Sequence, residues 1–401
     1  MSTKNYNDLW IQYFGDYTEA YCKAHGLFVA YKSDGSLRAL TRSLVDYASE
    51  IINTDLSMIF GEYFRITGNE SDVEALQEVL DLNEWDKLKY LFTLQGLVLG
   101  DTALKLGRDD NGQIRISIVS LLNDLSYRME NGEIVEWIYK WKRQKGSSNA
   151  GEYEEVIERY SKDRVVIEID GVRKEVPNRY GEFWLFHVPN IPSMKYGSIW
   201  GESELERIGD TVDELNSTFS KISAIETIYA NPKLLISGAA KTELTATDNA
   251  WFVPREASIA FLEYKGQIIP AMLQKVDRLI DYLRNKCPEL ILNDLGSISG
   301  YALKLKMTKL EKKIEAYRDR YFSAFKKMFG LILKMKKGPE YEPEIDIEVG
   351  PIVPADKEGL VNQMATLLEL GVISRQTIAE TFNIDFEEEQ KRIASEAVGE
   401  A

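Results

Sequence analysis

Between Gly300 and about Met335 the chain repeats apolar residues at helical spacing, which predicts one long helix. At roughly 1.5 Å per residue this helix would be about 50 Å long, which is unusual in a compact globular domain. Its apolar residues form a single stripe, at positions 303, 307, 310, 314, 317, 321, 325, 328 and 332. A helix of this length with one apolar stripe needs packing partners, and the rest of the chain has to supply them.

The same segment concentrates positive charge. From Gly300 to Lys337 it carries twelve Lys and Arg against three acids, a net charge of +9, whereas the whole chain has −15 and the remainder therefore −24. Such segregation indicates two surfaces with different partners. Three roles fit the basic helix: a surface helix supported by its own chain, a contact with nucleic acid, or a contact with an acidic neighbouring subunit.

The first part of the chain shows mixed helix and strand patterns. We predict helices over 36–52, 71–82 and 84–99, where apolar positions recur at helical spacing. Short alternating stretches follow, and Asn-Gly pairs at Asn111 and Asn131 mark hairpin turns. The predicted strands lie at 102–106, 114–119, 126–130, 134–141, 164–169, 174–176 and 183–188.

The pattern changes at Ser203-Glu204-Leu205-Glu206, a capping box that predicts the start of a helix with a narrow apolar seam. Pro232 ends this helix, and a second helix over about 270–286 ends before Pro288. Between the two helices, 233–265 has the pattern of a small strand-rich unit. After the long basic helix we predict a strand at 345–349, a helix over 356–369 closed by Gly371, a helix capped by Ser374 and a helix opened by Asp385.

Composition is that of an ordinary folded protein, with 44% hydrophobic and 28% charged residues. No apolar run approaches the roughly 20 residues of a membrane span, so we expect no membrane partner. Met1 to Trp10 lacks the pattern of a signal peptide, so we expect the protein to stay inside the cell that makes it. Cys22 and Cys287 are the only cysteines and lie far apart, which suits packing roles in a reducing compartment.

Patterns that carry catalysis are scarce. His25 and His187 lie in different regions, and neither has a His or Cys at metal-ligand spacing. The chain has no phosphate loop, no nucleophile elbow and no dinucleotide fingerprint. Asp109-Asp110-Asn111 begins like a calcium loop, but Ser120 stands where the liganding Glu belongs. We therefore predict no catalytic residue, no metal and no cofactor.

Paired acids leave one enzymatic alternative open. Asp210 with Asp213, and Glu387 to Glu389, could hold Mg²⁺ for phosphoryl chemistry, as in a metal-dependent nuclease. Each group lies on a predicted helix, where acids usually form a solvated face or favour the helix N-terminus. The sequence therefore favours a protein that is not an enzyme.

Several local patterns resemble those of the phage portal protein family. Gly201-Glu202-Ser203, followed by Asp213 to Ser217, resembles the start of that family's first stem helix, and Asn231-Pro232 leads there into its clip. The most specific match is Cys287-Pro288-Glu289-Leu290 followed by Ser299-Gly300-Tyr301-Ala302-Leu303-Lys304, which resembles the family's Pro-containing loop and the helix after it. Gly371-Val372-Ile373-Ser374 and the acidic stretch 385–392 resemble the C-terminal end of the family's sequences. The resemblance therefore spans roughly 180–398.

The resemblance implies an α+β portal fold with a mixed α/β wing, a helical stem, a small β-containing clip, a long wing helix and a short helical C-terminal crown. The corresponding regions would be the wing at 1–200, the first stem helix at 201–230, the clip at 231–266, the second stem helix at 267–287, the tunnel loop at 288–300, the long wing helix with a returning strand at 301–350 and the crown at 351–401.

Portal proteins form a ring at one vertex of the capsid, through which the genome is packaged and ejected. The resemblance therefore implies a homo-oligomeric ring, expected to be a dodecamer, that double-stranded DNA crosses. It also implies docking of the large terminase, of neck or adaptor proteins, and of capsid and scaffolding proteins. The location would be the portal vertex of the virion, with assembly in the host cytoplasm. The alternatives are another head-tail adaptor or scaffold, or the metal-dependent nuclease.

Three groups of residues are expected to carry this function. The narrow seam of the first stem helix would be covered by a neighbouring subunit in the ring, because one seam buries little area within one chain; it comprises Leu205, Ile208, Val212, Leu215, Phe219 and Ile222. The clip would offer a docking surface formed by Trp251, Phe252, Arg255 and Glu256. The tunnel loop would face DNA through Leu292, Asn293, Asp294, Leu295 and Ser297, without any Lys or Arg to hold phosphate.

Overall fold

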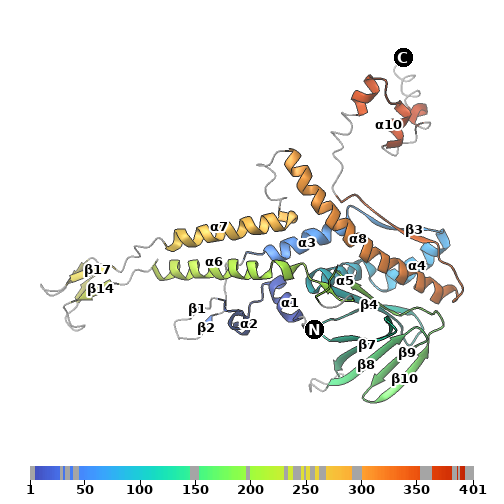
Figure 1. The fold of residues 1–401 in the computed structure, drawn as a ribbon, viewed down its shortest axis with the longest axis horizontal. Helices are drawn as coiled ribbons and strands as arrows, with labels where there is room; N and C mark the ends of the chain where they lie inside the picture. The colour runs from blue at the N-terminus through green and yellow to red at the C-terminus, as the bar shows by residue number, and fades with distance from the viewer. Residues whose placement is uncertain are drawn as a thin grey trace. The chain divides into compact units, whose positions relative to one another are not determined.

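The computed structural model describes residues 5–27, 30–31, 37–38, 45–144, 153–195, 199–229, 234–237, 245–247, 250–252, 258–261, 268–290, 300–352, 364–381, 386 and 389–392. The chain divides into two compact units, Met1–Val349 and Gly350–Ala401. Within the first unit, a body of helices and sheets is followed by two long helices with short strands between them (Figure 1). None of the helices in the described ranges is long and apolar enough to cross a membrane.

The body contains two larger antiparallel sheets. A three-stranded sheet has the order β11-β4-β5, and a five-stranded sheet has the order β10-β9-β8-β7-β6. Their strands are β4 (Asp101–Arg108), β5 (Ile114–Val119), β6 (Asp124–Glu130), β7 (Glu133–Gln144), β8 (Tyr153–Ser161), β9 (Arg164–Ile169), β10 (Val172–Pro177) and β11 (Leu185–Pro189). Shorter pairs join β1 (Ala30–Tyr31) to β2 (Leu37–Arg38), β12 (Ile191–Pro192) to β13 (Gly201–Glu202), and β3 (Phe64–Gly68) to β18 (Ile345–Val349).

The helices of the body pack around one central element, α8 (Gly300–Lys337), which confirms the predicted long helix. Its described apolar stripe is 1% exposed or less at Leu310, Ile314, Tyr317, Tyr321, Phe325, Met328 and Ile332. Phe325 lies edge-on to Trp85 at 4.9 Å between ring centroids. The partners that cover α8 include α3 (Tyr47–Phe60), α4 (Glu70–Leu82), β11 and β18. A further helix of the body, α5 (Trp85–Leu99), supplies Trp85 and packs on β4.

A close approach between α5 and α8 depends on a glycine. A Cβ atom at Gly96 would lie 2.1 Å from the Tyr321 hydroxyl oxygen. Only a residue without a side chain therefore lets this large aromatic ring sit against the backbone of α5. Tyr321 in turn donates a hydrogen bond to Asn190 Oδ1 at 2.9 Å.

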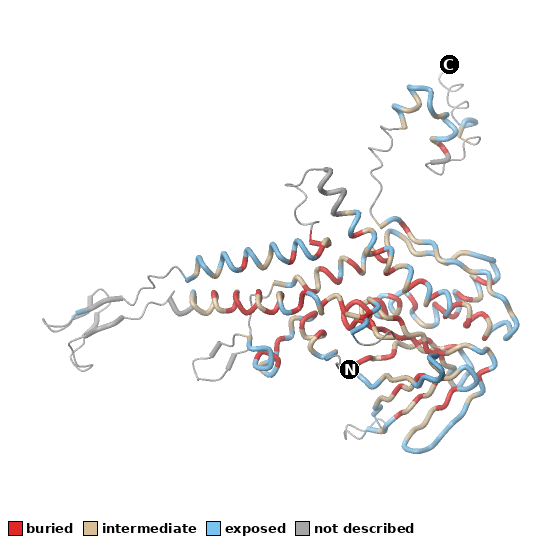
Figure 2. The backbone as a smooth tube through the Cα atoms, in the orientation of Figure 1, coloured by how far each residue is buried: buried red, intermediate tan, exposed pale blue. Residues whose placement is uncertain are grey.

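The two long helices that follow the body are α6 (Gly209–Tyr229), preceded by a 3-10 turn at Leu205–Arg207, and α7 (Ile268–Lys286). They run side by side (Figure 1). Buried residues follow one another along α6, whereas most of α7 is exposed (Figure 2). The reason is that α6 also contacts α1 (Tyr6–Phe14) and α3, so it is covered from more than one side.

Between α6 and α7 the chain forms the strands that the sequence predicts there. β14 (Leu234–Ser237) pairs with β17 (Ser258–Phe261), and β15 (Thr245–Thr247) pairs with β16 (Ala250–Phe252). In the second unit, α10 (Arg375–Thr381) begins after Ser374, whose Oγ accepts a hydrogen bond from Thr377 N–H at 3.1 Å. This confirms the predicted cap. Asp385 lies outside the described residues.

Two predictions about the body were wrong. The helix expected over 36–52 begins only at Tyr47, because Asp46 caps it by accepting from Ser49 N–H, and it continues to Phe60. The sequence did not predict the strand β8, because a charged residue on its buried face interrupts the alternation of apolar and polar residues. Glu158 is 5% exposed there, and Lys105 Nζ binds both of its carboxylate oxygens, at 2.7 and 2.6 Å.

Candidate functional site

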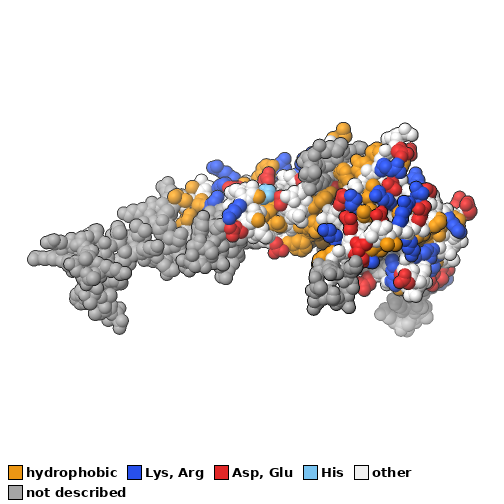
Figure 3. Space-filling model, turned by 90° about the horizontal axis from the view of Figure 1, so that it is seen from below, with side chains coloured by type: hydrophobic (Ala, Val, Ile, Leu, Met, Phe, Trp, Pro, Cys, Tyr) orange, Lys and Arg blue, Asp and Glu red, His pale blue; other side chains and the backbone are white. Residues whose placement is uncertain are grey.

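The basic residues of α8 are largely bound within the chain. Seven of them bind carboxylates or backbone carbonyls of the same subunit: Lys312, Lys313, Arg318, Lys326, Lys334, Lys336 and Lys337. Accordingly, acidic and basic side chains are interspersed over the face of the body that Figure 3 shows. These seven cations are therefore neutralised or hydrogen-bonded within their own subunit, and they are not available as a row of phosphate-binding groups.

The start of the first long helix is fastened to the body. Ser203 Oγ accepts a hydrogen bond from Leu205 N–H at 3.0 Å, and Glu206 Oε1 accepts from Ser203 N–H at 3.2 Å. Glu206 thus binds back to Ser203 as in the predicted capping box, while Ser203 Oγ caps the N–H two residues on instead of three. The chain passes so close to the body here that a Cβ at Gly201 would lie 2.4 Å from the carbonyl oxygen of Gly100.

A buried ionic cluster joins four parts of the chain. Lys313 Nζ on α8 lies 2.8 Å from Asp55 Oδ2 on α3, 2.9 Å from Glu204 Oε2 at the capping box, and 2.7 Å from Glu289 Oε1. Glu289 belongs to a short turn at 288–290, at the start of the segment 288–300 that is predicted as the tunnel loop. These four residues, the Lys313 cluster, therefore connect the body, the start of α6 and the base of that segment.

The Lys313 cluster contains more negative than positive charge. Asp55 Oδ1, Glu204 Oε1 and Glu289 Oε2 are buried and have no hydrogen-bond partner among the described residues. Burial raises the pKa of Asp55 well above its usual range, although Lys313 opposes the shift. Burial also opposes the charge of Lys313, but the three carboxylates outweigh it and raise the pKa of Lys313 well above its usual range.

The neighbouring Cys287 is not a reactive thiol. It is buried, and burial together with the charge of Glu289 raises its pKa to about 12. A thiol with such a pKa stays protonated at neutral pH and is a poor nucleophile. A cleft of about 510 Å³ opens beside the cluster, lined in part by Glu204, Cys287 and Glu289.

A second buried cluster holds the N-terminal helices against α6. Asp213 accepts hydrogen bonds from Tyr17 Oη at 2.8 Å, Tyr21 Oη at 2.6 Å and Gln12 Nε2 at 3.1 Å. We call these four residues the Asp213 cluster. Burial raises the pKa of Asp213, while its three hydrogen bonds act against the shift. Asp213 therefore serves packing, and Asp210, its predicted partner in a magnesium site, is exposed.

No group of acids, His or Cys that could hold a metal ion occurs within the described part of the chain. The predicted seam residues Leu205, Ile208, Val212, Leu215 and Ile222 are 6% exposed or less within one subunit. Helices α7, α1 and α3 of the same chain pack around this helix, so no neighbouring subunit is needed to cover these five residues. Phe219 is the seam residue that remains partly exposed. A role for the seam between subunits stays a prediction.

The other predicted site residues lie mostly beyond what the structure describes. Trp251 and Phe252 belong to β16, but their side chains are not described, and Arg255 and Glu256 lie outside the described residues. All five residues of the predicted tunnel loop, Leu292, Asn293, Asp294, Leu295 and Ser297, also lie outside them. The start of the predicted loop segment is described up to Leu290, which is 2% exposed.

Sequence reasoning missed both buried clusters. Glu204 and Glu289 stood inside the quoted motifs, and Lys313 stood inside the basic run, but no spacing linked them to Asp55. The sequence offered one weak signal for these clusters: charged residues at positions where the apolar pattern of a helix or a motif predicts burial. Tyr21 lies on the short helix α2 (Glu19–Ala24) and Tyr17 lies before its N-cap, so no helical spacing linked the two hydroxyls in the sequence.

Solved structures of particle necks and virions are among those that resemble the chain. The neck of an empty gene transfer agent (GTA) particle computed with C6 symmetry matches at a TM-score of 0.50 and 9% identity, covering 84% of this chain and 89% of that chain. The virion of a native GTA particle matches at 0.49 and 10% identity, over 84% and 88%. The neck of a native GTA particle computed with C12 symmetry matches at 0.46 and 9% identity, over 84% and 90%. No curated protein sequence matches significantly.

At such low identity the likeness concerns the fold alone, and it identifies the class as the mixed α+β fold of a chain in a particle neck. The family is shown by the sequence: residues 11–401 match the family described as phage portal protein, SPP1 Gp6-like, and the chain belongs to it. It is therefore a portal protein, a structural rather than enzymatic component that forms a homo-oligomeric ring at the portal vertex of the virion. The expected family is confirmed, and the adaptor and nuclease alternatives are set aside.

Proposed function

We propose that the ring of this protein, with about twelve subunits, is the conduit through which double-stranded DNA enters and leaves the capsid. Membership in the portal family supports this, and so does the net charge of −15, because an acidic channel repels phosphate and lets DNA move. The ring would dock the large terminase during packaging and neck or adaptor proteins afterwards. Capsid and scaffolding proteins would surround it as it assembles in the host cytoplasm.

The observation that carries the proposal for the channel is how the base of the tunnel loop is held. At the start of the predicted loop, Glu289 binds Lys313 and Leu290 is buried; at its end, the chain enters α8 at Gly300. A loop whose first residues are held by the body and that leads directly into α8 would be repeated at one level of a symmetric ring and form a collar. Its polar and acidic residues, with Asp294 among them, suit sliding rather than holding DNA.

The test is a charge reversal in the collar. Asp294→Lys would add one phosphate attraction per subunit and retard DNA movement, whereas Asp294→Asn would leave the packaging rate near that of the unmodified ring. Packaging would be measured at low and moderate salt, after electron microscopy of each variant has shown intact rings. If intact Asp294→Lys rings package at the unmodified rate at both salt concentrations, this loop does not face DNA.

The strands between α6 and α7 would form the clip that docks the motor and neck proteins. The support is the aromatic pair Trp251 and Phe252 on β16, close in sequence to the charged pair Arg255 and Glu256. Aromatic anchors flanked by charge are typical of binding surfaces. In a pull-down with the large terminase, exchange of Arg255 and Glu256 for Ala would weaken binding while rings stay intact. Unchanged binding would exclude this face.

A role of the first long helix between subunits is best tested at Phe219. Leu215→Asp would place a charge at a side chain that is fully buried within one subunit, so it would unfold the subunit as well as any ring. Phe219→Asp changes a partly exposed position. Smaller assemblies of folded Phe219→Asp subunits in light scattering would support the seam, whereas intact rings would remove Phe219 from it.

A further inference from the structure

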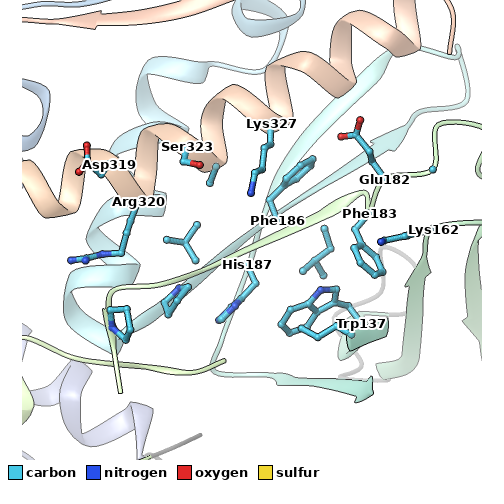
Figure 4. A pocket seen from close by; sticks show the side chains of 17 residues that line it. Trp137, Lys162, Glu182, Phe183, Phe186, His187, Asp319, Arg320, Ser323 and Lys327 are labelled. Atoms are coloured by element: carbon cyan, nitrogen blue, oxygen red, sulfur yellow. The ribbon is translucent and has the colours of Figure 1, made fainter. Parts of the chain in front are cut away.

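A groove of about 740 Å³ runs between α8 and the strands β7 and β11 (Figure 4). Its lining is mainly apolar and includes Trp137, Phe183 and Phe186. Phe183 and Phe186 are only partly buried. An apolar groove that stays open to solvent is a candidate contact surface, and its occupant has to bring an apolar side chain.

Three cations stand around this groove: Lys162, Arg320 and Lys327. Among the described residues, none of the three has a carboxylate at ion-pair distance, in contrast to the seven cations of α8 that are bound within the chain. Arg320 Nε is buried and lacks an acceptor within the described structure. Two acids also line the groove: Glu182 is already bound by Lys334, and Asp319 leaves the cations in excess. The occupant therefore has to bring acidic groups as well.

The turn between α4 and α5, which we call the corner (Asp81–Glu84), has that chemistry. Leu82 is 41% exposed, and the acidic Asp81 and Glu84 flank it on the surface. Asp81 accepts a hydrogen bond from Gln77, and Glu84 makes an exposed ion pair with Lys87 at 3.6 Å, so both carboxylates stay accessible to solvent. Glu84 adopts a left-handed conformation with φ of 50°, which costs about 1 kcal/mol or more for a residue other than glycine. Such backbone strain is consistent with a turn whose conformation is needed for binding to another surface.

The corner is held rigidly. Asn83 Nδ2 donates to the carbonyl oxygens of Val79 and Ile114 at 2.7 and 2.9 Å, and Asn83 Oδ1 accepts from Ile116 N–H at 2.9 Å. A side chain bonded to both α4 and β5 leaves the corner little freedom to move. A preformed knob loses little conformational entropy when it binds.

The groove and α4 lie on opposite sides of α8. Lys336 binds Glu78 and the carbonyl oxygen of Ala75 on α4, whereas Arg320 lines the groove. At about 100° per residue, the two positions are roughly 160° apart around the helix axis. In a ring, each subunit contacts its two neighbours through two different and complementary surfaces, which have to point in different directions. The groove and the corner meet this requirement.

We propose that the corner of one subunit inserts Leu82 into the groove of the next subunit, with Asp81 and Glu84 beside Lys162, Arg320 and Lys327. The occupant is thus a second copy of this chain, as apolar and charge complementarity require. The inference rests on the homo-oligomeric ring and specifies one contact that repeats around it. The basic helix α8 would then contact an acidic surface of the neighbouring subunit through Arg320 and Lys327.

Charge reversal on either side tests the contact. Lys327→Glu and Glu84→Lys would each place like charges together and weaken each contact about tenfold or more, so that light scattering and electron microscopy find fewer rings at a given concentration. The matched control is Lys326→Glu, a neighbouring exposed lysine that does not line the groove and binds Asp346. This control would retain rings.

Mixing separates a direct contact from a folding defect. In an equal mixture of Lys327→Glu and Glu84→Lys subunits, an alternating ring has only attractive contacts, so the mixture would form more rings than either variant alone. Circular dichroism would first show that each variant is folded. The proposal is overturned if the folded single variants form rings as the unmodified protein does, or if the mixture of folded variants forms no more rings than either variant alone. If the unmodified protein itself forms no ring, the proposed conduit fails instead.

Discussion

The Asp213 cluster and the Lys313 cluster both fasten the first long helix to the body, but their polar groups are balanced differently. Asp213 is a single carboxylate that accepts from three neutral donors. Lys313 is a single ammonium among three carboxylates, each of which keeps one buried oxygen without a partner among the described residues. A buried charge is tolerated when hydrogen-bond donors match acceptors, as around Asp213. When acceptors outnumber donors, as around Lys313, some buried oxygens stay without a partner and the stability of the site depends on pH.

The largest expected effect is the loss of the only cation in the Lys313 cluster. Lys313→Met keeps most of the side-chain volume but leaves three buried carboxylates unpaired, so we expect the free energy of unfolding to fall by about 3–5 kcal/mol. Urea denaturation at a fixed protein concentration would measure it. Lys309→Met, on an exposed position of the same helix, is the control and should change little. Equal effects of both variants would contradict a structural role of the cluster.

The next effect concerns the acceptor of the Asp213 cluster. Asp213→Ala would leave two tyrosine hydroxyls and one amide without their acceptor, at a cost of about 2–4 kcal/mol. Asp213→Asn retains one acceptor oxygen and should cost clearly less. Both values would come from the same urea titration. If the Asn variant is as unstable as the Ala variant, the negative charge rather than the number of hydrogen bonds stabilises this cluster.

Removal of one donor should have a smaller effect. Tyr17→Phe takes one hydrogen bond from Asp213 and leaves two, so we expect a loss of about 1 kcal/mol. Tyr153, which is 65% exposed, supplies the control Tyr153→Phe with no measurable change. A loss as large as that of Asp213→Ala would mean that the three hydrogen bonds act as one cooperative unit.

The smallest and most specific effect is a dependence on pH. Because burial raises the pKa of Asp55 above its unfolded value of about 4, the folded state binds more protons in the window between the two values. The free energy of unfolding therefore falls as pH rises through that window. Asp55→Asn cannot titrate, so it should lose less stability than the unmodified protein as pH rises above the unfolded pKa of Asp55. Parallel curves for both proteins would show that Asp55 does not carry this dependence.

Local patterns predicted much of the fold. The spacing of apolar residues placed α8, α5 and α7 to within two residues at their starts, and alternation placed β5, β9 and β18. The capping box at Ser203 and the cap at Ser374 also appear in the structure. These features depend on neighbours within a few residues, and such interactions are readable from one chain. The strand β8 was missed because a buried ion pair between Glu158 and Lys105 breaks the apolar pattern.

The candidate site was less predictable for the same physical reason. The seam positions were correctly recognised as apolar, but the sequence does not say whether α7 or a neighbouring subunit covers them. Lys327 and Lys326 are adjacent and identical in sequence, yet one lines an open groove and the other binds Asp346. Which surface a charged residue faces depends on helix rotation and on partners far away in the chain.

The sequence by itself therefore determined the family, the long basic helix, the order of helices and strands and the scarcity of catalytic residues, because these follow from motifs and from periodicity along the chain. Only the tertiary structure decided that most cations of α8 are bound internally, that Asp55, Glu204, Glu289 and Lys313 share one buried site, and that a groove and a corner lie on opposite sides of α8. The reason is that charge pairing and burial are set by distances between residues up to hundreds of positions apart, such as Asp55 and Lys313, and no local pattern records those distances.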